Sequence, residues 1–204
     1  LLNNSSGNIS LAGINFISVY PGNGTNVENI SAFSGNNFPS LDIFSGTNSD
    51  TVNFNGDITF ASGDGLYVDL QNGSPKPNSV TIAPNANIIA TGTGPISVYA
   101  SRSVDMGAGS SFEVLDGYLT MEANKQTTPT AGDFIGINLN GATIKSTGTG
   151  YVTVNGTGGD GAGSVNGYQF GVQVVNGAKV IGGDPGAVIL TGNGGASSNI
   201  VNRG

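Results

Sequence analysis

Four of the aspartates that lie beside glycine are candidates for chemistry, because their carboxylates could either bind calcium or shape a turn. They are Asp64, Asp133, Asp160 and Asp184. Calcium-binding β-rolls repeat Gly-Gly-x-Gly-x-Asp followed by an apolar residue in tandem, and GGDGAGSVN around Asp160 does not match that pattern. Aspartate beside glycine is also ordinary turn chemistry, because its short carboxylate bonds to nearby backbone. We therefore expect no metal-binding residue and no cofactor, with calcium as the alternative.

Acid–base catalysis has few candidate residues in this chain, which contains no His and no Cys. Glycoside hydrolysis needs two carboxylates at a fixed separation. Asp69, Asp105 and Asp116 fall on or beside expected strands, but the Lys and Arg residues are scattered and pair with none of them in sequence. We predict that the protein is not an enzyme and has no catalytic residue. A polysaccharide-active enzyme built on a coil of strands is the less favoured alternative.

Tyrosines recur near one class of expected strand, and two interpretations stay open. Exposed rings would form a stripe that stacks on sugars, whereas the simpler interpretation is that the rings pack at coil edges or under loops. The five residues are Tyr67, Tyr99, Tyr118, Tyr151 and Tyr168.

The charge balance bears on the partners. The chain of 204 residues has 13 acidic and 6 basic residues, for a net charge of −7. The basic residues form no patch that could neutralise a run of phosphates, so nucleic acid is not an expected partner. No apolar run approaches the ~20 residues of a membrane-spanning helix. We therefore expect a protein that does not span a membrane.

A repeat dominates the sequence. Asn140–Gly159 and Asn176–Gly195 are identical at eight of twenty positions, and the TGTG turn of 91–94 returns at 147–150. Each unit holds three short segments in which apolar and polar residues alternate, a pattern typical of half-buried strands. Short turns rich in Gly and Asn join them, because those residues adopt positive φ at low cost.

Length varies at only one point of each unit, after the third segment. The insertions are 71–79, 124–134 and 156–170. This arrangement predicts an all-β solenoid, a parallel β-helix with three short strands per coil and insertions at one corner. Each strand should pair in register with its equivalents one coil away. The expected third strands are Leu66–Leu70, Ile96–Ala100, Tyr118–Ala123, Tyr151–Asn155 and Ala187–Thr191.

The expected interior consists of aliphatic columns that run along the axis. The second strands should contribute Ile88, Val114, Ile144 and Val180. The third strands should contribute the pairs Ile96/Val98, Leu119/Met121, Val152/Val154 and Val188/Leu190. Stacked Asn and Thr residues at the corners could form hydrogen-bonded ladders.

The domain expected is one solenoid spanning residues 1–204, with regular coils over 51–204. Residues 1–50 contain strand-like stretches, such as NFISVY and SLDIF, whose spacing is irregular. We interpret them as N-terminal coils with larger insertions. The chain also reads as a piece of a longer protein.

The pattern ATIxxTGTGxVTVxGxGG over 142–159, together with VTIAPNANI over 80–88, resembles filamentous-haemagglutinin-like exoproteins and autotransporter-type adhesins. The similarity covers about residues 50–204. It implies a right-handed parallel β-helix, secretion to the cell surface, and an adhesive or architectural role without a catalytic motif to transfer.

The function expected is therefore that of a secreted, extracellular adhesin or surface-fibre segment. A self-assembling sheath or filament subunit is the alternative. The partners expected are a host or neighbouring-cell surface, carbohydrate, or a second copy through end-to-end or lateral assembly. Loops at the variable corner would make the contacts, because loops on a rigid scaffold can vary freely. The candidate contact residues are Lys76, Asn78, Lys125, Asp133, Asp160 and Tyr168.

Overall fold

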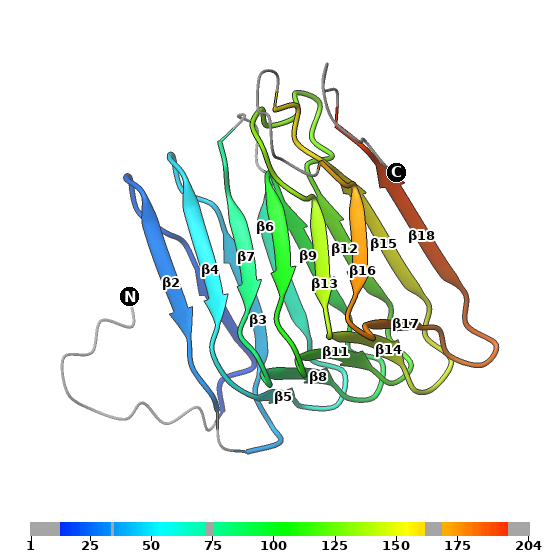
Figure 1. Cartoon of the computed structure of the whole chain (residues 1–204). Coiled ribbons are helices and arrows are strands. Elements are labelled where there is room, and N and C mark those ends of the chain that lie inside the picture. The colour runs from blue at the N-terminus through cyan, green and yellow to red at the C-terminus, as the bar shows by residue number, and fades with distance from the viewer. Residues whose placement is uncertain (1–12, 34, 72–75, 162–168, 196–204) are drawn as a thin grey trace.

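A computed structural model of the chain describes residues 13–33, 35–71, 76–161 and 169–195. These residues form only strands and connecting turns, and the strands gather into three parallel sheets wrapped around one interior (Figure 1). Successive coils advance along the axis from β2 at one end to β18 at the other, winding right-handed. The three-strand parallel β-helix expected from the repeat is confirmed. No helix in the described residues could cross a membrane.

Each of the three strands of a coil joins its own sheet. The seven-stranded sheet has the order β1 (Phe16–Val19), β3 (Ser40–Phe44), β6 (Leu66–Leu70), β9 (Ile96–Ala100), β12 (Leu119–Ala123), β15 (Val152–Thr157) and β18 (Val188–Asn193). The six-stranded sheet has the order β16 (Val172–Val175), β13 (Ile137–Asn140), β10 (Ser103–Met106), β7 (Ser79–Ile82), β4 (Asp50–Phe54) and β2 (Asn26–Ile30). The five-stranded sheet has the order β17 (Lys179–Ile181), β14 (Thr143–Ser146), β11 (Ser111–Val114), β8 (Asn87–Ala90) and β5 (Ile58–Phe60).

Pairing in register creates the columns of the interior. Ile144 lies opposite Val180 in neighbouring strands, and Val152 lies opposite Val188. The predicted interior residues from Ile88 to Val154 are fully buried. In the last described coil, Val188 and Leu190 face inward but are 43% and 50% exposed, because no further described coil covers them. Val180 is partly buried against the core.

The corners use Asn and Gly as expected. Asn85 and Asn176 have φ of 62° and 55°, in the left-handed region that few residues adopt cheaply. Side-chain ladders also run between coils, as predicted. Asn53 Nδ2 donates to Asn29 Oδ1 at 3.1 Å, and Asn176 Nδ2 donates to Asn140 Oδ1 at 2.6 Å.

Residues 16–30 and 38–50 fit the frame better than their sequence indicated. Strand β1 pairs with β3, β3 pairs with β6, and β2 pairs with β4. Among its described residues, the coil that holds β2 and β3 has no strand in the five-stranded sheet. Instead, Phe38 forms a single bridge to Phe60, and the two rings meet edge to face at 5.7 Å. Phe16 pairs with Ser40 and Leu41 pairs with Leu66, at sequence offsets of 24 and 25 residues, whereas Val152 pairs with Val188 at an offset of 36. The expectation of larger insertions in the N-terminal coils is therefore wrong for the described residues.

Candidate functional site: the outer face of the seven-stranded sheet

The outer face of the seven-stranded sheet carries a group of aromatic and acidic side chains. In β6, Leu66, Val68 and Leu70 are buried, and strand alternation therefore turns Tyr67 and Asp69 outward. The same alternation operates in β3, β9 and β12. We call the resulting set the tyrosine–carboxylate face, and its members are Asp42, Tyr67, Asp69, Tyr99 and Glu122.

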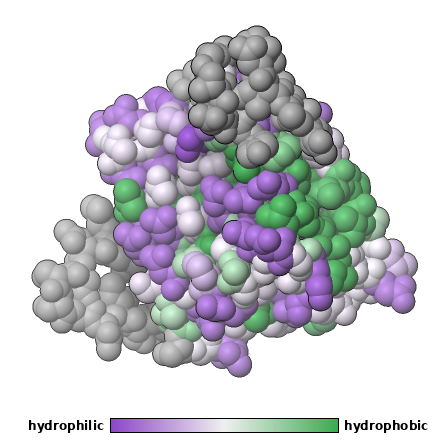
Figure 2. All heavy atoms as spheres, in the orientation of Figure 1, coloured by the Kyte–Doolittle hydropathy of each residue, from purple (hydrophilic) through white to green (hydrophobic). Residues whose placement is uncertain are grey.

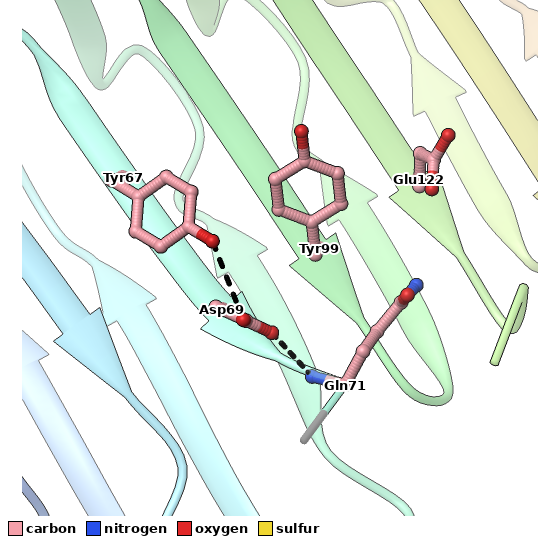
Figure 3. Close-up of a pocket in the computed structure, with 5 residues that line it drawn as sticks. All are labelled: Tyr67, Asp69, Gln71, Tyr99 and Glu122. Atoms are coloured by element: carbon pink, nitrogen blue, oxygen red, sulfur yellow. Dashed lines mark hydrogen bonds between the residues drawn. The ribbon is translucent and has the colours of Figure 1, made fainter. Parts of the chain in front are cut away.

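Register sets the order of these side chains. Asp69, Tyr99 and Glu122 are direct partners on three successive strands, so Tyr99 has a carboxylate on each side. Asp42 is the partner of Tyr67 in the same way. Figure 3 shows the Tyr67 and Tyr99 rings side by side, with Asp69 and Glu122 flanking them. Together with Gln71, these four side chains line an open depression of about 300 Å³.

A second depression adjoins the first. It has a volume of about 310 Å³ and shares Tyr67 with its neighbour. Asp42, Ser97 and Tyr118 also line it. Tyr67 therefore stands between two hollows on one face, and a ligand in either hollow would contact this ring.

The aromatic rings form tracks parallel to the axis. Phe44 and Tyr67 have ring centroids 5.9 Å apart, as do Tyr67 and Tyr99, and both pairs are tilted by nearly 60°. Tyr118 and Tyr151 stack almost flat at 5.9 Å, and they are 42% and 50% exposed. The rings of Tyr67 and Tyr99, and those of Tyr118 and Tyr151, thus pack in pairs on the surface of the sheet, and a sugar-binding stripe stays a prediction.

Local hydrogen bonds hold the face in place. Tyr67 donates its hydroxyl to Asp69 Oδ2 at 3.4 Å, and Asp69 Oδ1 accepts from the Gln71 backbone N–H at 3.0 Å. The Gln71 amide donates to the Ala100 carbonyl at 3.2 Å, which ties the edge of the depression to β9. Within the described part of the chain, the Glu122 carboxylate forms no hydrogen bond or ion pair.

Partial burial and neighbouring negative charge make this face unfavourable for further anions. Desolvation raises the pKa of Tyr67, and the adjacent Asp69 carboxylate raises it further. Desolvation also raises the pKa of Tyr99, with a further contribution from Glu122. The pKa of the Asp42 carboxyl rises through burial as well. Both tyrosines therefore stay protonated and neutral at physiological pH.

This arrangement places aromatic rings beside carboxylates on one face. The rings supply apolar faces and the carboxylates supply hydrogen-bond acceptors and negative charge. Among the described residues, this face included, no group of three or more acidic side chains lies close enough to hold a metal ion. The face therefore offers aromatic surface and negative charge to a ligand.

The contact residues expected at the variable corner divide into different roles. Asn78 is only 3% exposed and serves the fold. Its Oδ1 accepts from the Asp50 N–H at 2.7 Å, and its Nδ2 donates to the Leu70 carbonyl at 2.9 Å. Lys76 is half-buried, and its carbonyl accepts hydrogen bonds from the Asn78 N–H at 2.8 Å and from the Ser101 hydroxyl. The stretch of 76–78 is thus fixed to its neighbours through these two residues.

The remaining candidates lie on the other two loops. Lys125 is half-buried and Asp133 is exposed. Asp160 is exposed, and its Oδ1 accepts from the Gly132 N–H at 2.9 Å, which joins two loops of successive coils. Tyr168 lies outside the described residues. The described candidates lie in the connections from the seven-stranded to the six-stranded sheet, and these connections follow one edge of the β-helix (Figure 1).

Sequence reasoning identified Tyr67 and Tyr99 but missed their connection with Asp69 and Glu122. The signal was present, because outward residues of successive third strands can be aligned once the coil is known. Aligning LYVDL, ISVYA and LTMEA places Asp69, Tyr99 and Glu122 in one row. Searching for metal patterns within single segments could not reveal a row contributed by three coils.

No family model, curated protein or solved structure matches this chain.

Proposed function

We propose that the protein is a non-enzymatic adhesin or surface-fibre segment that works outside the cell. In this proposal the β-helix is a rigid stalk, and the tyrosine–carboxylate face is its main contact surface. The corner loops beside it, with Lys125, Asp133 and Asp160, extend that surface along one edge.

One observation carries the proposal. Aromatic and acidic side chains are gathered on the outer face of a single sheet, in register over several coils. Tyrosines are enriched in binding surfaces because a large, rigid ring contributes contact area at low entropic cost. The parallel columns beneath fix the backbone that displays them, so ligand binding would require little reorganisation.

Adherence provides the test. Beads coated with the protein should attach to a panel of cell surfaces, and Tyr67→Ser combined with Tyr99→Ser should reduce attachment. Lys145→Gln, on the five-stranded sheet where Lys145 pairs with Glu113 at 2.9 Å, is the matched control and should leave attachment unchanged. Equal loss in both variants, or release of new reducing or unsaturated ends from polysaccharides, would contradict the proposal.

A second candidate function, self-assembly into a filament, rests on the end of the β-helix at the last described coil. Hydrophobic residues gather at this end, on the side where β18 lies (Figure 2). The inner-face residues Val174, Val188 and Leu190 are 41–50% exposed. The outer edges of β16, β17 and β18 have no strand partner among the described residues. Such edges can pair with another chain.

The opposite end is less apolar. Glu28 faces inward there, one coil beyond Val52. Desolvation raises the pKa of this carboxyl, and the nearby Asp50 charge raises it further. Inward charges of this kind discourage edge pairing. Light scattering across a dilution series tests the second candidate, since polymers that grow with concentration and disappear in Leu190→Lys would support it, and a monomer at every concentration would exclude it.

A further inference from the structure

We infer that the ligand of the tyrosine–carboxylate face is cationic, a lysine- or arginine-bearing segment of a partner protein. The inference rests on the proposed function, because it names the partner chemistry of the same contact surface. Two features of the face support the inference, its negative charges and its aromatic rings.

Charge complementarity is the first argument. Asp42, Asp69 and Glu122 give the face three carboxylates, whereas none of the strands of the seven-stranded sheet contains a Lys or Arg residue. Elsewhere on the β-helix, Glu113 has the partner Lys145 at 2.9 Å. Negative charge on this face is therefore not compensated within the sheet. An arriving ammonium or guanidinium group would provide the compensation.

The placement of the rings is the second argument. A cation over the face of a tyrosine is attracted by the ring quadrupole. Tyr99 lies between the two carboxylates of Asp69 and Glu122, and Tyr67 contacts Tyr99 at 5.9 Å. A cation seated on these rings would thus meet carboxylates on both sides. The length of a lysine or arginine side chain also suits a hollow that is open to solvent, because the apolar stem can lie on a ring.

The same features disfavour two other ligands. An anionic polysaccharide would be repelled by the three carboxylates. A neutral sugar could stack on the rings, but it would remove Asp69 and Glu122 from water without neutralising their charge, which is costly. The tyrosine–carboxylate face therefore favours a basic peptide as its ligand over the carbohydrate that the sequence suggested.

The experiment measures binding of the whole protein to short peptides with lysine or arginine at alternate positions, by calorimetry at low and moderate salt. A neutral oligosaccharide is titrated in parallel. We expect the peptides to bind, the oligosaccharide not to bind, and affinity to fall as salt increases. Tyr67→Leu with Tyr99→Leu, and Asp69→Asn with Glu122→Gln, should each weaken peptide binding by about 5-fold or more.

The matched control is Glu113→Gln with Asp184→Asn, which removes two negative charges away from the face. It should change affinity by less than about 2-fold, the range of weak exposed charge effects. Equal weakening in the control and in the Asp69/Glu122 variant would reduce the effect to net charge and overturn the inference. The inference would also be overturned if the peptides did not bind, or if the oligosaccharide bound and the Tyr67→Leu with Tyr99→Leu variant lost that binding. In that last case the contact face of the proposed function would stand and only its ligand would change.

Discussion

Individual glycines at the second-to-third turn have a steric role. Gly94, Gly117, Gly150 and Gly186 stack along the axis, each in the turn that precedes a strand of the seven-stranded sheet. A Cβ at Gly150 would collide with the carbonyl oxygen of Gly117 one coil away, and the atom it would meet is backbone that cannot swing aside. The repeated glycine in the sequence therefore reports the close approach of coils as well as turn geometry.

Gly150→Ala should lower the free energy of unfolding by about 3 kcal/mol or more, because a backbone clash in a packed turn must shift two coils. Gly22→Ala is the control, since a Cβ there has open space and the backbone has no positive φ. Chemical denaturation of both variants checks this. Similar stability of the two would show that the coils are not in close contact at this turn.

Asp105 gives stability a dependence on pH. Its carboxyl lies on the outer face of the six-stranded sheet, where it accepts hydrogen bonds from Ser103 at 3.1 Å and Asn138 at 3.4 Å. Desolvation raises its pKa above the ordinary value of 3.8, although the bonds from Ser103 and Asn138 act in the opposite direction. Between the ordinary and the raised value the folded state binds more protons, so stability falls as pH rises through that range.

Asp105→Asn removes this ionisation while keeping the shape of the side chain. The variant should melt at a higher temperature than the parent at pH 7, and the gap should shrink as pH falls towards 3.8, where the parent carboxyl also becomes neutral. Thermal melts from pH 3 to pH 7 measure the effect. A gap that is constant with pH, or that widens in acid, would refute this assignment.

At the scale of elements, burial depends on having a coil on each side. Leu119 in β12 and Leu190 in β18 both point inward in the same sheet. Leu119 is 0% exposed between β9 and β15, whereas Leu190 is 50% exposed at the edge. The two leucines should therefore contribute different amounts to the free energy of unfolding.

Leu119→Ala should cost about 2–5 kcal/mol of unfolding free energy, as for a fully buried leucine that leaves a cavity. Leu190→Ala should cost less than about 1 kcal/mol, because about half of the side chain is already in water. Equilibrium denaturation of the two variants makes the comparison. Equal losses would mean that another chain or segment covers the last described coil in solution.

The elements show how far sequence reasoning could reach. Leu66–Leu70 and Ile96–Ala100 were predicted to the residue, because alternation and short turns define them without tertiary information. The buried role of Asn78 could not be foreseen, since its partners at Asp50 and Leu70 lie in other elements. The exposure of Val188 likewise depends on whether another coil stacks on it, and the local sequence pattern carries no information about that neighbour.

At the scale of the molecule, everything depends on coils that stack in register. The tyrosine–carboxylate face exists only because outward residues from four successive coils pair in register. Slipping one strand by a single residue would turn its outward side chains into the interior. Register is therefore the property that links the repeat in the sequence to the proposed binding surface.

Engineered disulfides measure register directly, because the chain has no cysteine of its own. Thr120 and Thr153 are outward partners on β12 and β15, and Asn155 lies two residues further along the second strand. Partners in a parallel sheet are about 4.8 Å apart, within the range that a disulfide spans. Thr120→Cys with Thr153→Cys should therefore cross-link within one chain on mild oxidation, and Thr120→Cys with Asn155→Cys should not. Intact mass and peptide mapping at low protein concentration would show this, and a cross-link in the offset pair without one in the register pair would contradict the stacked-coil account.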